Sequence, residues 1–141
     1  MTKSWSLVIL CASALAFTPA ARGKGAPEFP HGTFITTITR GDVPPDIPDE
    51  TANVLASAWE ITFGDSGKLI ARKDGAEVVR GDYAATATSV VFSNDAGEYA
   101  CGVNGTYAWK LDDKNLVLTK SADDCAGRAV VLTVHPLKPR S

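Results

Sequence analysis

The chain has 141 residues, a formal net charge of −2, 45% hydrophobic residues and 21% charged residues. This length fits one domain, and the composition is typical of a globular protein rather than a disordered one. The slight negative charge excludes the basic stripe that nucleic-acid-binding proteins carry, so we expect no nucleic-acid partner.

The first 21 residues have the pattern of a secretory signal peptide. Lys3 gives a positive start, residues 5–17 are almost wholly apolar, and Ala20 and Ala21 are small residues suited to cleavage. The apolar run is too short to span a membrane, and no second run of about 20 apolar residues follows. We therefore predict an exported protein, periplasmic or extracellular, without a membrane span. The alternative is a retained N-terminal strand or anchor.

Residues 22–32 are rich in glycine and proline, which predicts a flexible lead-in. Residues 33–39 are dense in β-branched side chains and predict the first strand. Prolines between residues 41 and 48 exclude a central strand there. Asp49 can then cap a short helical segment that ends near Ser57, with Val54 and Leu55 as its apolar contacts. This segment would form a lid or plug between strands.

From residue 58 onward the chain has the pattern of a meander. Trp59, Ile61 and Phe63 alternate with polar residues, as in a half-buried strand. Turn signals such as Asp74-Gly75 separate further strands at residues 68–73, 77–85, 90–92, 105–111, 115–119 and 129–135. With the strand at residues 33–39 this makes an all-β, eight-stranded antiparallel domain over residues 33–138. Closure into an up-and-down β-barrel removes the exposed edges, and a two-sheet sandwich is the alternative.

Cys101 and Cys125 are the cysteines that remain beyond the predicted signal peptide. Paired cysteines in an exported chain predict a disulfide bond, worth roughly 3 kcal/mol in the chain-entropy model. The alternative is a free thiol pair or a metal site. His31 and His135 are the only histidines, and neither has a Cys, Asp or Glu at ligand spacing, so we expect no metal and no cofactor.

Four short motifs resemble the calycin group, and most of all the small secreted lipocalin-like domains of bacteria. They are Trp-x-Ile-x-Phe at 59–63, Gly-Asp-Tyr at 81–83, Gly-Thr-Tyr-Ala-Trp at 105–109 and Asp-Cys-Ala-Gly-Arg at 124–128. The resemblance implies a barrel whose one end is closed by the guanidinium group of Arg128 over the indole of Trp59. The chain also resembles the periplasmic inhibitors of bacterial metalloproteases, which implies a lead-in that enters a protease cleft.

The predicted inward face supplies the candidate ligand contacts. Pockets for small apolar molecules are lined by apolar and aromatic side chains with a few polar anchors, here the hydroxyls of Tyr83 and Tyr107. The alternative is a solid core, because protein interiors are close-packed. The candidates are Trp59, Ile61, Phe63, Tyr83, Phe92, Tyr107, Trp109 and Leu118, and Leu69 and Leu116 share their face.

The sequence offers no convincing catalytic constellation. No serine lies in a Gly-x-Ser-x-Gly turn, and we interpret Asp123 and Asp124 as a solvated turn in which Asp124 pairs with Arg128. We therefore predict an exported, monomeric, non-enzymatic lipocalin-like protein that binds a small apolar ligand. The alternative is a periplasmic protein-binding module, such as a protease inhibitor or an envelope scaffold, with a filled barrel.

Overall fold

The computed structural model describes residues 26–141, and the predicted signal peptide lies outside this range. The described residues form a single antiparallel sheet with two α-helices and one short 3-10 helix. The strands are β1 (Gly32–Thr37), β2 (Ala58–Phe63), β3 (Lys68–Lys73), β4 (Ala76–Ala85), β5 (Ser89–Ala96), β6 (Gly105–Asp112), β7 (Asn115–Ala122) and β8 (Lys138–Pro139). The helices are η1 (Arg40–Asp42), α1 (Asp49–Leu55) and α2 (Ala126–Thr133).

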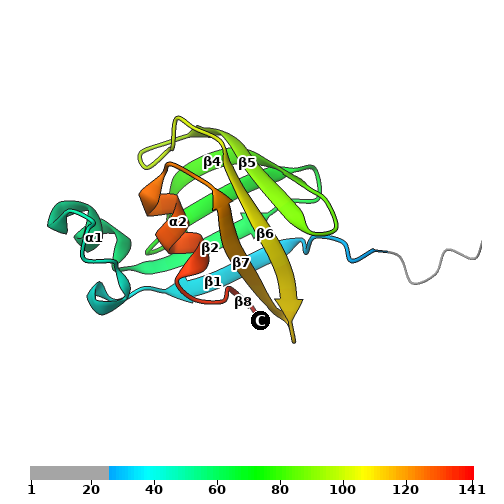
Figure 1. Ribbon diagram of the computed structural model, residues 1–141, viewed down its shortest axis with the longest axis horizontal. Helices are drawn as coiled ribbons and strands as arrows, with labels where there is room; N and C mark the ends of the chain where they lie inside the picture. The colour runs from blue at the N-terminus through cyan, green and yellow to red at the C-terminus, as the bar shows by residue number, and fades with distance from the viewer. Residues whose placement is uncertain (1–25) are drawn as a thin grey trace, which may run out of the picture.

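The sheet curls into a nearly closed barrel. Its strand order is β7-β6-β5-β4-β3-β2-β1-β8, so β7 and β8 are the outermost strands. These two ends meet where Leu116 of β7 and Leu137, just before β8, exchange two backbone hydrogen bonds of 2.9 Å. Figure 1 shows the resulting barrel, with α2 lying against it and α1 projecting from one end. The prediction of an eight-stranded antiparallel barrel is confirmed.

The last strand of the barrel is not where the sequence predicts it. Residues 129–135 are rich in β-branched side chains, yet most of them belong to helix α2. Three consecutive residues of this helix, Val130, Val131 and Leu132, are buried, whereas a half-buried strand would bury alternate residues. Packing of this helix against the barrel therefore outweighs the strand propensity of the segment. The eighth strand is the short β8, which pairs with β1.

The helical segment predicted between the first two strands is present. It comprises η1 and α1, and Pro48 rather than Asp49 occupies the position before the first residue of α1. Ala52 and Leu55 are the buried residues of α1. Because the segment leaves β1 and returns to β2, it lies at the barrel end where β2 begins, as Figure 1 shows, and Trp59 is the second residue of β2.

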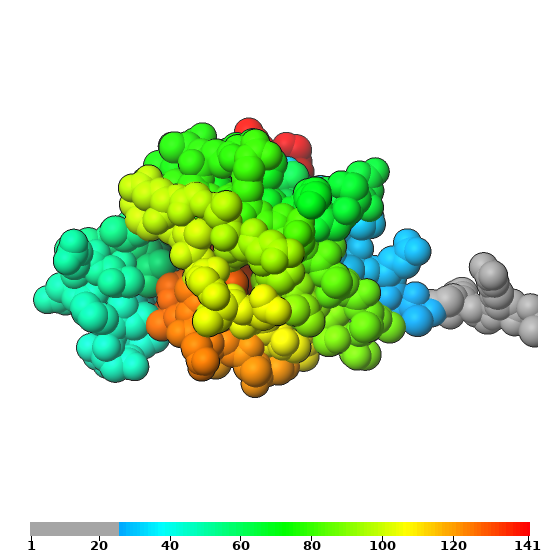
Figure 2. All heavy atoms as spheres, turned by 90° about the horizontal axis from the view of Figure 1, so that it is seen from above, coloured from blue at the N-terminus to red at the C-terminus, as the bar shows by residue number. Residues whose placement is uncertain are grey.

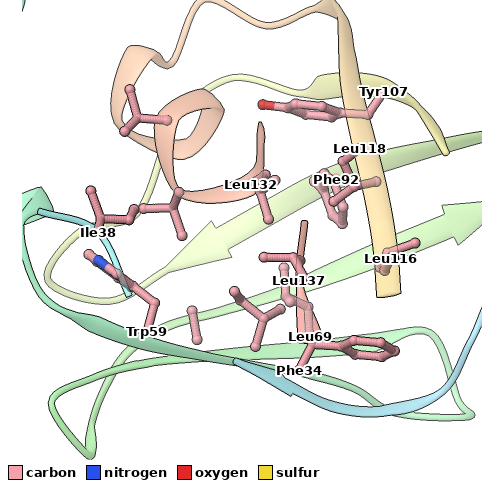
Figure 3. Packing of buried hydrophobic residues seen from close by; sticks show 14 of the residues in the cluster. Phe34, Ile38, Trp59, Leu69, Phe92, Tyr107, Leu116, Leu118, Leu132 and Leu137 are labelled. Atoms are coloured by element: carbon pink, nitrogen blue, oxygen red, sulfur yellow. The ribbon is translucent and has the colours of Figure 1, made fainter. Parts of the chain in front are cut away.

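The other end of the barrel is filled by aromatic rings, and we call it the closed end. Phe29 is only 6% exposed, and its ring centroid lies 5.0 Å from Phe63, 5.4 Å from Tyr83 and 5.3 Å from Trp109. Phe29 belongs to the segment predicted as a flexible lead-in, so the described end of that segment is instead anchored in the core. Figure 3 shows the packed interior from close by, with Leu137 beside its bridge partner Leu116.

All ten residues predicted to face inward are buried. They are Trp59, Ile61, Phe63, Leu69, Tyr83, Phe92, Tyr107, Trp109, Leu116 and Leu118.

Candidate functional site

A cavity of about 460 Å³ lies at the barrel end opposite Phe29, and we call it the mouth cavity. Its walls come from α1, from strands β2 to β5, from the loop between β5 and β6, and from α2. In Figure 2 the orange atoms of α2 lie between the teal atoms of the α1 segment and the yellow-green atoms of this loop. Most of the lining is apolar, and its buried apolar members include Leu55, Trp59, Ile61, Leu69, Val131 and Leu132.

The residues predicted to contact a ligand divide between the cavity and the packed core. Trp59 and Ile61, both on β2, line the mouth cavity. The other six are buried in the hydrophobic core without lining the cavity: Phe63, Tyr83, Phe92, Tyr107, Trp109 and Leu118. The alternation of the strands predicts which residues face inward, but it carries no information on where the interior stays unfilled. The remaining walls come from α1, α2 and a loop, which strand patterns do not describe.

Cys101 and Cys125 lie at disulfide distance, with their Cα atoms 6.1 Å apart, as predicted. Cys101 belongs to the β5–β6 loop and Cys125 immediately precedes α2. Both residues line the mouth cavity. The pair therefore joins two of the non-strand segments that form the cavity wall.

A buried ionic cluster stands beside the cavity. Arg128 of α2 donates from Nε to Asp123 Oδ2 and from Nη2 to Asp123 Oδ1, both at 2.7 Å. Its Nη1 donates to Asp95 Oδ2 at 2.9 Å. The side chains of Arg128, Asp95 and Asp123 are 8%, 3% and 0% exposed. Asp123, not the exposed Asp124, is thus the neighbouring partner of Arg128, and the prediction for this turn is wrong.

Asp123 is the better satisfied of the two carboxylates in this cluster. Besides the two bonds from Arg128, it accepts hydrogen bonds from the Tyr107 hydroxyl and, at 2.9 Å, from the backbone N–H of Cys125. Burial raises the pKa of Asp123, but the hydrogen bonds from Arg128 and Tyr107 outweigh burial and lower the pKa below its usual value. Burial, together with Asp123, raises the pKa of Tyr107, so this hydroxyl stays protonated and acts as a donor.

Asp95 is less well satisfied. Its Oδ1 is buried and has no hydrogen-bond partner among the described residues. Burial raises the pKa of Asp95, and the neighbouring Arg128 and the backbone N–H of Cys101 offset this only in part. A Cβ at Gly81 would lie 2.4 Å from Asp95 Oδ1, and a Cβ at Gly105 would lie 2.4 Å from Asp123 Oδ2. Both carboxylates therefore depend on a glycine in a neighbouring strand for their space.

The resemblance implies that Arg128 covers the indole of Trp59, but the structure gives both groups other partners. The guanidinium group is directed at the two carboxylates and, from Nη2, at the carbonyl of Val103 at 2.8 Å. The indole N–H of Trp59 donates to the carbonyl of Leu55 at 2.9 Å, which ties β2 to the end of α1. The two residues share the lining of the mouth cavity.

The two histidines lie apart from this cavity. His31 Nδ1 lies 2.9 Å from the Tyr83 hydroxyl, and His135 Nε2 lies 3.1 Å from Asp42 Oδ2. Hydrogen bonds from Thr39 lower the pKa of the half-buried Asp42 to about 2. Across residues 26–141, no three His, Cys, Asp or Glu side chains are grouped to hold a metal ion. No helix in the same range has the length and hydropathy needed to cross a membrane.

No family model, curated protein or solved structure matches the chain. The mouth cavity and the Arg128–Asp95–Asp123 cluster are therefore the features from which a function is inferred. The sequence motif at 124–128 points to Arg128, but Asp95 falls in a stretch predicted to be a loop. That stretch instead extends β5 as far as Ala96, with Asn94 at a positive φ of 54°.

Proposed function

We propose that this chain is an exported, non-enzymatic, lipocalin-like protein that binds a small apolar molecule in the mouth cavity. The observation that carries the proposal is the cavity itself, about 460 Å³ with mostly apolar walls. Pockets for small ligands typically measure about 300–1,000 Å³ and combine apolar walls with a few polar groups. Here the charged lining residues are Asp95, Asp124 and Arg128, while Trp59, Ile61 and Leu69 lie among the apolar ones.

The contrast between the cavity and the rest of the interior supports a binding site. Protein interiors are close-packed, and the core that adjoins the cavity obeys this rule, since Phe63, Phe92 and Tyr107 are at most 1% exposed. The mouth cavity therefore adjoins a well-packed core rather than a loosely packed interior. Export is supported by the apolar N-terminal pattern and by the Cys101–Cys125 pair, since disulfides persist in oxidising compartments.

A binding role is favoured over catalysis because the charged groups of the cluster already form hydrogen bonds with one another. Arg128 and Asp123 are held by several mutual hydrogen bonds, so neither is free to exchange a proton with a bound molecule.

A protein-binding module, such as a protease inhibitor or an envelope scaffold, is the second candidate. It is supported by the six predicted contacts that are packed into the core and by Val103, a 46% exposed side chain on the β5–β6 loop.

The test is binding of diphenylhexatriene, a fluorescent hydrocarbon without hydrogen-bonding groups, to the purified protein. We expect its fluorescence to rise on binding, and Val79→Trp to weaken its affinity about tenfold or more by filling the cavity. Val79 is a half-buried residue of β4 that lines the cavity. Val91→Trp is the matched control, because Val91 is a half-buried residue of β5 outside the lining.

The proposal fails if the unaltered protein leaves the fluorescence of diphenylhexatriene unchanged. It also fails if Val79→Trp and Val91→Trp bind the probe equally well while both remain folded by circular dichroism. In either case the protein-binding candidate becomes the better one.

A further inference from the structure

We infer that the ligand of the mouth cavity is an amphipathic molecule with an apolar body and a cationic, hydrogen-bond-donating head such as a primary amine. This inference rests on the proposed function, because it assigns a ligand class to the same cavity. It follows from which charged groups line the cavity and which of them are already neutralised.

The cavity offers no free cation to an anionic ligand. Among the described residues that line it, Arg128 is the one cationic side chain. Each of its three nitrogens already donates to a carboxylate, at 2.7 Å to Asp123 and 2.9 Å to Asp95. Recognition of a carboxylate by a buried arginine uses the same donors in a bidentate arrangement. A fatty-acid head group would therefore have to displace Asp95 or Asp123 from Arg128.

The cluster also carries an excess of negative charge. Two buried carboxylates share one guanidinium group, and the Tyr107 hydroxyl stays neutral, which leaves a formal charge of −1 in the cluster. The excess is least compensated at Asp95, because its Oδ1 has no hydrogen-bond partner among the described residues. Uncompensated charge in a buried site is costly, and a cation in the adjacent cavity would offset that cost.

A second carboxylate lines the same cavity. Asp124 lines the cavity and is exposed, next to the half-buried Cys125. An amphipathic molecule can then place its head toward Asp95 and Asp124 and its body along the apolar wall of Trp59, Ile61 and Leu69. A protonated amine fits these two carboxylates because it donates hydrogen bonds and carries the complementary charge.

The experiment compares octylamine, octanol and octanoate, which share one hydrocarbon chain and differ in the head group. Each is titrated into the purified protein at pH 7 and low ionic strength, below its micellar concentration, and its binding is measured by calorimetry. We expect octylamine to bind at least about tenfold more tightly than octanoate, with octanol between them, since charge-assisted hydrogen bonds exceed neutral ones.

Variants locate the head group. Asp95→Asn should reduce the preference for octylamine over octanol about tenfold, and Asp124→Asn should reduce it a few-fold because Asp124 is exposed. Asp112→Asn is the control for net charge, because Asp112 is exposed and does not line the cavity. If Asp95→Asn does not fold, Asp124→Asn still tests the inference, since no side-chain hydrogen bond of the described residues involves Asp124.

The outcomes separate the two proposals. If diphenylhexatriene binds, two results overturn the inference and leave the cavity a binding site. One is that octanoate binds as tightly as octylamine. The other is that Asp124→Asn and Asp112→Asn show the same head-group preference. Failure of diphenylhexatriene to bind overturns the proposed function, and with it the inference that rests on it.

Discussion

The two ends of the barrel are built from the same strands, but one is packed with aromatic rings and the other holds a cavity. At the closed end, Phe29 and the strand residues Phe63 and Trp109 fill the interior, and the indole N–H of Trp109 donates to the Thr86 carbonyl. At the mouth, helices and a loop supply the walls, a cavity remains, and the indole N–H of Trp59 donates to the Leu55 carbonyl. Strand residues and the single lead-in residue Phe29 thus fill one end, whereas the other is shaped by helices, a loop and buried charge.

The largest expected effect comes from the charged cluster at the mouth. Asp123→Ala should lower the free energy of unfolding by about 3–5 kcal/mol, because it leaves the buried Arg128 without its main partner. Asp124→Ala, one residue further along, should change it by less than about 0.5 kcal/mol, because Asp124 is exposed. Urea unfolding followed by tryptophan fluorescence measures both. Equal losses of unfolding free energy in the two variants would mean that the cluster does not stabilise the mouth end of the barrel.

A pair of leucines compares the packed core with the wall of the mouth cavity. Leu116 is fully buried where the sheet closes, so Leu116→Ala should cost about 4 kcal/mol of unfolding free energy. Leu69 is 7% exposed and lines the mouth cavity, so fewer atoms surround it and Leu69→Ala should cost only about 2 kcal/mol. Chemical denaturation of the two variants side by side gives the difference. A Leu69→Ala loss as large as that of Leu116→Ala would indicate that the cavity is closed in solution.

The inward faces of the strands could be predicted from the sequence, and the two ends of the barrel only in part. A spacing of two residues places Trp59, Ile61 and Phe63 on one face of β2, and burial of all three confirms it. The same rule fails at α2, where a β-branched segment forms a helix because three consecutive residues are buried against the barrel. Local propensity spans only about 1 kcal/mol in strands, so tertiary packing easily reverses it.

The charged cluster was beyond the reach of sequence reasoning for a related reason. Asp95 and Asp123 are 28 positions apart, and they meet at Arg128 only because β5 continues to Ala96 and α2 turns back over the barrel. The motif at 124–128 singles out Arg128, and Asp124 is the carboxylate that the motif contains. The structure reverses this choice because Asp123 points inward to Arg128 and Tyr107 while Asp124 faces solvent.

The smallest expected effect distinguishes the two carboxylates that share Arg128. Asp95→Asn should change the free energy of unfolding at pH 7 by about 1 kcal/mol or less, because the amide oxygen can still accept from Arg128 Nη1.

The sign of the pH dependence separates them further. The pKa of Asp95 is raised above its ordinary 3.8, so the folded protein binds a proton more tightly than the unfolded chain, and stability falls as the pH rises from about 3.8 through the raised value. The pKa of Asp123 is lowered, so its contribution to stability is complete above 3.8 and is lost as the pH falls through the lowered value.

Relative to the unaltered protein, Asp95→Asn should therefore gain stability as the pH rises through the first window. Asp123→Asn should lose relative stability as the pH rises through the second window. Urea midpoints measured between pH 2 and pH 7 test both signs. A relative loss by Asp95→Asn on raising the pH would show that Arg128 outweighs the burial of Asp95, so that this carboxylate is not the under-compensated one.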